Sequence, residues 1–245
     1  MKKIALVSHG CAKNLVDSEL MLGLLSENGY GITLDEKDAD IVIINTCSFI
    51  HDAEKESVDS ILEMINDGKK VIIAGCLAQK HGEELKKAIP EISALVGTTD
   101  FTKIINVIKA IEDGKEYIEE VSNQPEYIYP ENIKRQQITV GSSSYIKIAD
   151  GCNYRCGYCI IPYLRGDYHS RKMEDIIAEA NELVNKGVTE IILIAQDTTG
   201  YGVDLYKKPM LPELLRELNK IENLGWIRIM YAYPTQMTDE LLDAI

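Results

Sequence analysis

Short apolar runs rich in β-branched residues alternate with amphipathic stretches along the first 112 residues. The two patterns differ because strands buried on both faces are almost continuously apolar, whereas helices show an apolar period of about 3.6 residues. The runs predict strands at 3–8, 32–34, 39–45, 70–74 and 93–96, and the amphipathic stretches predict helices at 15–27, 53–65, 83–88 and 101–111. This alternation indicates a doubly wound α/β domain, a parallel sheet covered by helices on both faces, over residues 1–113.

The alternation stops between residues 114 and 139, where prolines, tyrosines and polar residues gather. This composition predicts a linker that carries a strand or two at most. The alternation then resumes, with strands predicted at 144–149, 190–195 and 226–231 and helices at 173–186, 211–221 and from 239 onward. Residues 140–245 are therefore expected to form a second α/β domain.

Composition narrows the class of protein. Hydrophobic residues make up 45% of the chain and charged residues 27%, which is typical of a soluble globular protein and excludes intrinsic disorder. No stretch approaches the roughly 20 apolar residues of a membrane span, and the N-terminal apolar run is too short for a signal peptide. We therefore expect a cytoplasmic protein with no membrane partner.

The net charge of −13 bears on the partner. It disfavours a surface that follows nucleic-acid phosphates, so a nucleic acid is not expected as the direct substrate. A small-molecule site or a basic protein partner suits the charge better.

Three of the cysteines, Cys152, Cys156 and Cys159, form a C-x3-C-x2-C motif directly after a predicted strand. Zinc sites usually take four ligands, commonly as paired C-x2-C units. Three thiolates in one loop fit a cubane iron–sulfur cluster with one iron left open to a small chelating ligand. The alternatives are three unligated thiols, or a zinc site completed by a distant residue.

The other cysteines, Cys11, Cys47 and Cys76, have no ligand spacing, but each follows the carboxyl end of a predicted strand. In an open parallel sheet these ends lie along one edge, where ligands bind. The three thiols could therefore converge on one point, and three converging thiols would again imply a cluster with an open iron. The alternative is that each is an ordinary small buried residue.

Several polar residues have simpler interpretations. Asn14, Asp17 and Ser18 open a predicted helix, where such side chains serve as caps and dipole partners, and we interpret them so. Arg165 follows the tight cysteine motif and is either a carboxylate-binding residue or a solvated arginine.

The tight motif, with Tyr158 just before its last cysteine, resembles that of the radical S-adenosylmethionine (SAM) superfamily. Two three-cysteine sets, one in each domain, make the whole chain similar to the methylthiotransferase family within it. The matching segments are 10–19, 45–50, 75–77, 150–162, 165–166 and 170–171. Within that family, Lys-Asn-Leu-Val-Asp-Ser-Glu at 13–19 and Ala-Gln-Asp-Thr-Thr at 195–199 resemble the branch that modifies a ribosomal protein more than the transfer-RNA branch.

The resemblance implies a fold and a set of cofactors. The second domain would be the first part of a radical SAM (β/α) barrel. The cofactors would be SAM and two [4Fe-4S] clusters, with Cys11, Cys47, Cys76, Cys152, Cys156 and Cys159 as metal ligands. Four other residues would bind SAM, with Tyr158 near its adenine: Tyr158, Gln196, Asp197 and Arg171. The alternatives for these four are a core tyrosine, polar loop residues and a solvated arginine.

The resemblance also implies an activity, the addition of a methylthio group to the β-carbon of an aspartate in a small-subunit ribosomal protein, with electrons from a separate donor. One alternative is a transfer-RNA methylthiotransferase. Another is an iron–sulfur electron carrier or scaffold without SAM chemistry. A complete (β/α)8 barrel takes about 250 residues, and 245 − 139 = 106 residues follow the linker. We therefore expect the second domain to be truncated.

Overall fold

The computed structural model describes residues 2–127, 129, 134–138 and 141–245. It divides into two compact units, one formed by residues 1–126 with 130–138 and the other by 127–129 with 139–245. Parts of the expected linker, residues 128, 130–133 and 139, lie outside the described residues, as does residue 140 at the expected start of the second domain. Each unit is described by itself below.

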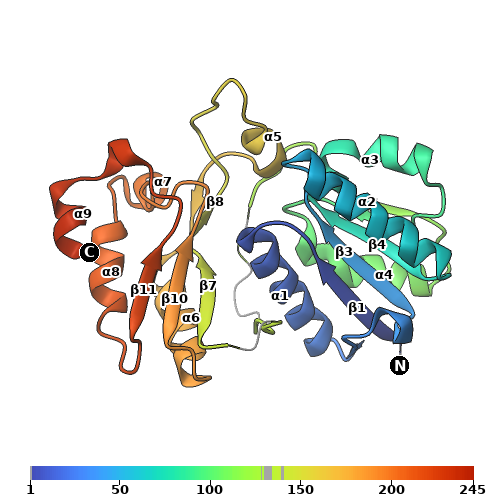
Figure 1. Ribbon diagram of the computed structural model, residues 1–245, viewed down its shortest axis with the longest axis horizontal. Helices are drawn as coiled ribbons and strands as arrows, with labels where there is room; N and C mark the ends of the chain where they lie inside the picture. Colours follow the sequence, from blue (N-terminus) through green and yellow to red (C-terminus); the bar gives the residue numbers. More distant parts are fainter. Residues whose placement is uncertain (1, 128, 130–133, 139–140) are drawn as a thin grey trace. The chain divides into compact units, whose positions relative to one another are not determined.

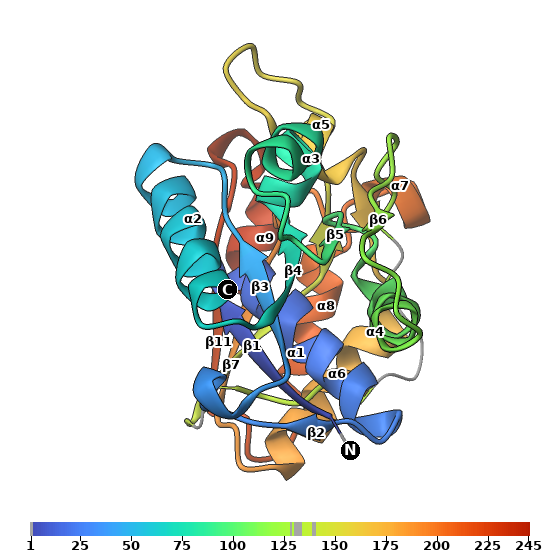
Figure 2. The same cartoon turned by 90° about the vertical axis from the view of Figure 1, so that its right-hand side faces the viewer.

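The first unit contains a six-stranded parallel sheet with the order β2-β1-β3-β4-β5-β6. Its strands are β1 (Lys3–Ser8), β2 (Gly31–Ile32), β3 (Ile41–Thr46), β4 (Lys70–Gly75), β5 (Ala94–Val96) and β6 (Ile118–Glu120). Its helices are α1 (Ala12–Glu27), α2 (His51–Asn66), α3 (Cys76–Ala88) and α4 (Ile104–Glu112), with short 3-10 turns η1 (Glu36–Asp38) and η2 (Phe101–Lys103). Helices α2 and α3 cover one face and α1 and α4 the other, which confirms the doubly wound domain (Figure 2).

Strand β3 explains why this sheet is covered on both faces, because all its residues are buried. Val42 and Ile44 pack in one core cluster with Ile61 of α2 and Leu77 of α3. Their neighbours in the strand point to the opposite face, since side chains alternate along a strand. A continuous apolar run therefore fits a central strand.

The second unit contains a parallel sheet with the order β11-β10-β7, so strands that follow one another in the chain also pair (Figure 1). Its parallel strands are β7 (Ser143–Lys147), β10 (Glu190–Ile194) and β11 (Trp226–Ile229). The helices between and after them are α6 (Met173–Asn185), α7 (Val203–Tyr206), α8 (Leu211–Leu218) and α9 (Asp239–Ala244), with the 3-10 turn η3 (Pro234–Gln236). Sequential parallel strands joined by helices form the first part of a (β/α) barrel, as expected.

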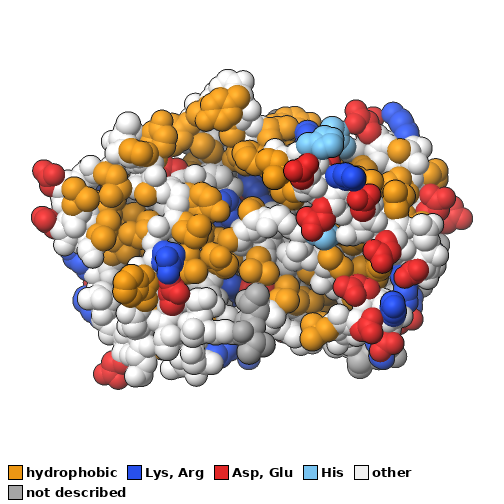
Figure 3. Space-filling model, viewed as in Figure 1, with side chains coloured by type: hydrophobic (Ala, Val, Ile, Leu, Met, Phe, Trp, Pro, Cys, Tyr) orange, Lys and Arg blue, Asp and Glu red, His pale blue; other side chains and the backbone are white. Residues whose placement is uncertain are grey.

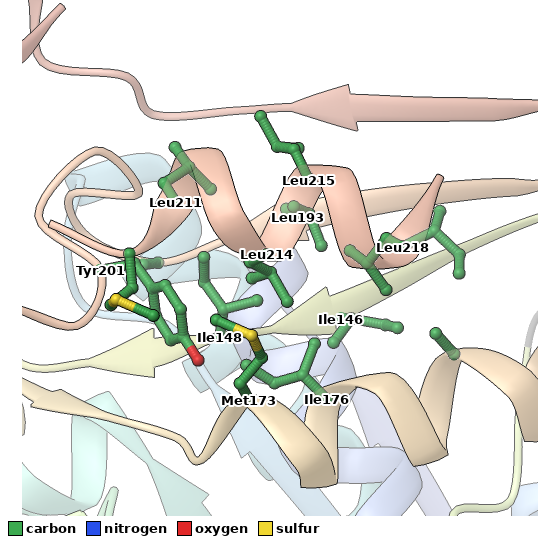
Figure 4. Close-up of a cluster of buried hydrophobic side chains, with 14 of the residues drawn as sticks. Ile146, Ile148, Met173, Ile176, Leu193, Tyr201, Leu211, Leu214, Leu215 and Leu218 are labelled. Atoms are coloured by element: carbon green, nitrogen blue, oxygen red, sulfur yellow. The ribbon is translucent and has the colours of Figure 1, made fainter. Parts of the chain in front are cut away.

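The core of the second unit lies between the sheet and its helices. Ile146 and Leu193 of the sheet pack with Ile176 of α6 and Leu214 of α8 (Figure 4). Leu214 and Leu218 lie on the same apolar face of α8, at the i, i+4 spacing of an amphipathic helix.

Three elements next to the cysteines differ from the sequence prediction. The strand expected at 144–149 ends at Lys147, and β8 (Ala149–Asp150) pairs antiparallel with β9 (His169–Ser170). A short helix, α5 (Ile161–Arg165), follows the tight cysteine motif. The helix expected at 83–88 already begins at Cys76, with a kink at His81. Among the described residues, none of the helices is both long and apolar enough to cross a membrane.

Candidate functional site

The tight cysteine motif lies in a loop that leaves β8 and returns at α5, the uppermost loop in Figure 1. Gly151 opens the loop with φ +77°, and a Cβ atom there would lie 1.9 Å from the Asp167 carbonyl oxygen. The Cys152 N–H donates to the Gly166 carbonyl (3.1 Å) and the Cys159 N–H to the Cys156 carbonyl (2.9 Å). The backbone thus fixes both ends of the motif, and the glycine permits the close approach.

The three thiols of this loop influence one another. Burial raises the pKa of Cys152, and the nearby thiols of Cys159 and Cys156 raise it further. None of the three is in a disulfide. Bringing three thiolates together is therefore unfavourable without a cation, and metal binding supplies one while releasing the thiol protons. This donor set fits an iron–sulfur cluster.

A buried carboxylate, Asp150, anchors the start of the loop. Its Oδ2 accepts hydrogen bonds from Lys147 and Arg165, both at 2.8 Å. Its Oδ1 accepts from the Gly151 N–H at 2.9 Å and from Gln196 Nε2 at 2.7 Å. Burial alone would raise the pKa of Asp150, but the two cations outweigh it and hold this pKa well below its usual range. Arg165 is thus a buried partner of Asp150 and not a solvated side chain.

Asp197 lies at a cavity beside the loop. The cavity has a volume of about 360 Å³, and Cys152, Tyr154, Tyr168 and Asp204 also line it. Asp197 Oδ2 accepts a hydrogen bond from the Tyr154 hydroxyl (2.8 Å), and the Asp197 carbonyl accepts one from Tyr168 (2.8 Å). The structure therefore brings a predicted cofactor residue and a predicted ligand cysteine to one cavity.

The other three predicted cofactor residues differ in their surroundings. Gln196 has a buried Oε1 with no hydrogen-bond partner within the described part of the chain. Arg171 is buried, donating from Nη1 to Glu179 (2.6 Å) and packing against the Tyr129 ring. Tyr158 is 92% exposed. The cofactor roles of these residues stay predictions.

Figure 3 shows one face of the surface, and two features of it bear on partners. Acidic side chains gather over α2, whose sequence contains Asp52, Glu54, Glu56, Asp59 and Glu63. The cysteine loop and α5 expose aromatic side chains, those of Tyr154, Tyr158 and Tyr163.

The dispersed cysteines follow three adjacent parallel strands of the first unit. Cys11 comes after β1, Cys47 directly after β3, and Cys76 directly after β4. A Cβ atom on Gly10 would lie only 3.1 Å from Cys47 Sγ, so the Cys11 and Cys47 loops are in contact. The strand order reverses between β1 and β3, where doubly wound sheets bind ligands.

None of the three thiols of this unit is in a disulfide, and all three share one sheet edge, a donor set that fits a cluster. Across the part of the chain that the structure describes, no group of three or more His, Cys, Asp or Glu side chains is close enough to hold a metal ion. Neither set of three thiols therefore forms a closed ligand shell, and the ligand roles of the cysteines stay predictions.

The interpretation of Asn14 and Ser18 as helix caps is wrong. Cys11 is the N-cap of α1, without a side-chain capping bond. Asn14 and Ser18 are instead fully buried, and both hydrogen-bond with neighbouring loops and strands; Asp17 is buried as well. Sequence reasoning missed their partner Asn45, although a polar residue ending an apolar strand was a usable signal.

Part of the expected linker is fastened to the first unit. Glu19 of α1 is buried and forms an ion pair with Arg135 (2.5 Å). The same carboxylate accepts the Ile138 N–H (3.0 Å), and the Glu19 carbonyl accepts the Gln136 N–H (3.1 Å). Glu19 thus holds residues 135–138 against α1.

Two family models match different parts of the chain. A family model described as "Uncharacterized protein family UPF0004" matches residues 3–97, and the radical SAM superfamily model matches residues 146–245. Among solved structures, the radical S-adenosylmethionine methyltransferase TsrM from Kitasatospora setae aligns with a TM-score of 0.68 at 14% identity, over 100% of this chain and 57% of that one. The cobalamin-dependent radical enzyme OxsB aligns with a TM-score of 0.57 at 13% identity, over 100% and 41%. These two likenesses concern the fold alone.

Fold and superfamily match define a radical SAM protein with an added N-terminal α/β domain. Sequence similarity to curated proteins identifies the family. The ribosomal protein uS12 methylthiotransferase RimO of Caldanaerobacter subterraneus is 53% identical over 100% of this chain and 57% of the relative. RimO of Synechococcus sp. (strain RCC307) is 51% identical over 98% of this chain and 49% of the relative. The chain belongs to the RimO branch of the radical SAM methylthiotransferase family, and it spans about half the length of these relatives.

Proposed function

We propose that this chain carries the cofactor-binding part of a methylthiotransferase that modifies ribosomal protein uS12, at the β-carbon of an aspartate. The observation that carries the proposal is the 53% identity to a uS12 methylthiotransferase along the whole chain. The three-cysteine loop beside the Asp197 cavity supports the same chemistry.

The proposal includes two [4Fe-4S] clusters, one per unit. None of the three thiols in each unit is in a disulfide, and each set follows the carboxyl ends of strands, which suits three-cysteine ligation with an open iron. The residues that would hold them are Cys11, Cys47, Cys76, Cys152, Cys156 and Cys159. When bound, the second-unit cluster and SAM supply the radical chemistry, and the first-unit cluster supplies the sulfur group.

The residues around the second loop would prepare the SAM site. Asp150 fixes the loop start through Lys147 and Arg165. Asp197 keeps Tyr154 and Tyr168 beside the cavity. The unpaired Oε1 of Gln196 is available to accept a hydrogen bond from the SAM amino group.

Two further residues belong to the proposal. Tyr158, exposed on the loop, would cover the adenine. Arg171 would contribute positive charge near the SAM carboxylate, although Glu179 already neutralises much of it.

The partners follow from charge and chemistry. A net charge of −13 suits a basic ribosomal protein, because complementary charges favour encounter. The reaction also requires a separate electron donor. We place this activity in the cytoplasm, where ribosomal proteins are assembled.

Two other functions remain as outcomes of the test, a transfer-RNA methylthiotransferase and an electron carrier. The test compares cells that lack the protein with the same cells after its expression is restored. Peptides of uS12 and transfer RNA are isolated from both and analysed by mass spectrometry. We expect the mass of a methylthio group on uS12 only. Its appearance on transfer RNA alone would overturn the substrate. Unchanged uS12 and transfer RNA, with no 5′-deoxyadenosine released from SAM by the reduced protein, would overturn the enzyme.

A further inference from the structure

The three cysteine loops of the first unit meet at a pair of buried asparagines, Asn14 of α1 and Asn45 of β3. The side-chain amide of Asn14 donates to the Thr46 carbonyl (2.8 Å) and to the His9 carbonyl (3.2 Å). Thr46 immediately precedes Cys47, and His9 lies two residues before Cys11. One amide group therefore joins two cysteine loops.

The third loop, which carries Cys76, contacts Asn45. Asn45 Nδ2 donates to the Asn14 carbonyl (2.9 Å) and to Ser18 Oγ (2.9 Å), which orients its side chain. Its Oδ1 then lies against Gly75, where a Cβ atom would come within 2.3 Å. Gly75 has φ +88° and immediately precedes Cys76, so Asn45 shapes the backbone that presents this thiol.

Few other side chains could replace a buried amide in such a hydrogen-bond network. Both N–H groups of the Asn14 amide are used on backbone carbonyls of different loops. If they are removed, two carbonyls beside the cysteines lose their partners, which is costly in a buried site. Such supporting hydrogen bonds are also what holds metal ligands in a productive geometry.

We propose that Asn14 and Asn45 are positioning residues that hold the three loops carrying Cys11, Cys47 and Cys76 against one another before any iron is bound. The cluster part of this proposal rests on the proposed function, whereas the placement of the thiols does not. Asn14 Oδ1 also accepts a hydrogen bond from the Cys11 thiol (3.9 Å), so Asn14 orients this thiol as well as the loops, whereas Asn45 acts through the loops that carry the cysteines.

The test isolates the first-unit thiols. In a chain with Cys152, Cys156 and Cys159 replaced by alanine, the remaining thiols are those of Cys11, Cys47 and Cys76. Phenylarsine oxide, which binds two neighbouring thiols at once, is titrated into this metal-free protein. Asn14→Asp keeps the size and an acceptor oxygen but removes both donors. We expect it to weaken arsenical binding by about 10-fold, and to lower the iron retained after reconstitution to less than half of about four atoms per chain.

Two controls separate positioning from general damage. Asn28→Asp alters an exposed asparagine at the other end of α1 that also donates to a backbone carbonyl, that of Leu24 (2.9 Å). Ile61→Val trims a fully buried side chain of the same unit and lowers its stability without touching the network. Both are expected to bind arsenical and iron as the parent does. If Asn14→Asp fails to fold, Asn14→Ser is measured by the same criteria.

Each outcome decides a separate question. Unchanged arsenical binding by a folded Asn14 variant, or an equal loss in Ile61→Val, overturns the positioning role. A parent that binds arsenical but no iron leaves the positioning role intact and overturns the proposed first-unit cluster.

Discussion

The Tyr154 hydroxyl, between the first two cysteines of the second-unit loop, donates a 2.8 Å hydrogen bond to Asp197 Oδ2 at the end of β10. Burial and the Asp197 carboxylate raise the pKa of Tyr154 to about 12, so the phenol remains a donor at neutral pH. The Tyr154 ring also packs 4.9 Å from that of Tyr233. The cysteine loop is therefore attached to two strand ends of its unit.

Tyr154→Phe should loosen this loop while leaving every thiol in place. Loss of one charge-assisted hydrogen bond costs about 1.5 kcal/mol, which corresponds to roughly 10-fold faster amide exchange across residues 152–159. Hydrogen exchange with mass spectrometry on the metal-free protein measures this. Tyr163→Phe, on the neighbouring exposed side of α5, is the control and should exchange as the parent does. Equal rates in both variants would contradict the attachment.

Asp150→Asn should destabilise the second unit strongly. The substitution leaves Lys147 and Arg165 buried without their shared carboxylate, and breaking a buried ion pair from one side costs about 3–5 kcal/mol. Urea unfolding followed by the fluorescence of Trp226, the single tryptophan, reports on this unit. Asp175→Asn, at an exposed position in the first turn of α6, should cost less than about 1 kcal/mol. Similar losses in the two variants would contradict the buried network.

Glu19→Gln should release residues 135–138 from α1. The neutral amide cannot balance the buried Arg135 guanidinium, so the segment should open more often. Trypsin cleavage after Lys134 and Arg135 should accelerate by at least about 10-fold, and gel or mass analysis follows it. Glu27→Gln, at the exposed end of the same helix, is the matched control. Cleavage that is no faster than in this control would show that Glu19 does not hold the segment.

The buried Tyr201 should make the stability of the second unit depend on pH. Burial raises the pKa of Tyr201 far above its ordinary value, and the neighbouring Tyr206 raises it further; inside the core the phenol donates to the Arg171 carbonyl (2.9 Å). A raised pKa means that this stabilisation is complete below the unfolded value of about 10 and is lost as pH rises above it. Urea midpoints should therefore fall above about pH 10, and less steeply in Tyr201→Phe. Parallel curves for parent and variant would contradict this assignment.

The strands of the sheet could be predicted from the sequence because the apolar pattern that identifies each strand lies within that strand. Residues 41–44 of the predicted strand at 39–45 are apolar on both faces, which favours a strand buried on both sides. The strand-end positions of Cys11, Cys47 and Cys76 likewise follow from the order of strands and helices. Sequence alone therefore sufficed for the doubly wound domain and for the shared edge of the sheet.

The sequence did not predict which side chains form hydrogen bonds with one another, because the paired residues lie far apart in the chain. Asn14 and Asn45 are 31 positions apart, and Asn14 at a helix start has the signature of a cap. Arg165 carries no sign in its own segment that Asp150 lies beside it in a buried site. The β8–β9 hairpin was missed for a similar reason, since two-residue strands have too few positions to show a period.

We propose that the dispersed cysteines form a second cluster site distinct from the tight motif. Iron and sulfide analysis after anaerobic reconstitution tests it in three proteins: the parent, a variant with alanine at Cys11, Cys47 and Cys76, and one with alanine at Cys152, Cys156 and Cys159. We predict about eight irons in the parent, the sum of two cubanes, and about four in each variant. A variant without Cys11, Cys47 and Cys76 that keeps all the iron of the parent would contradict the claim.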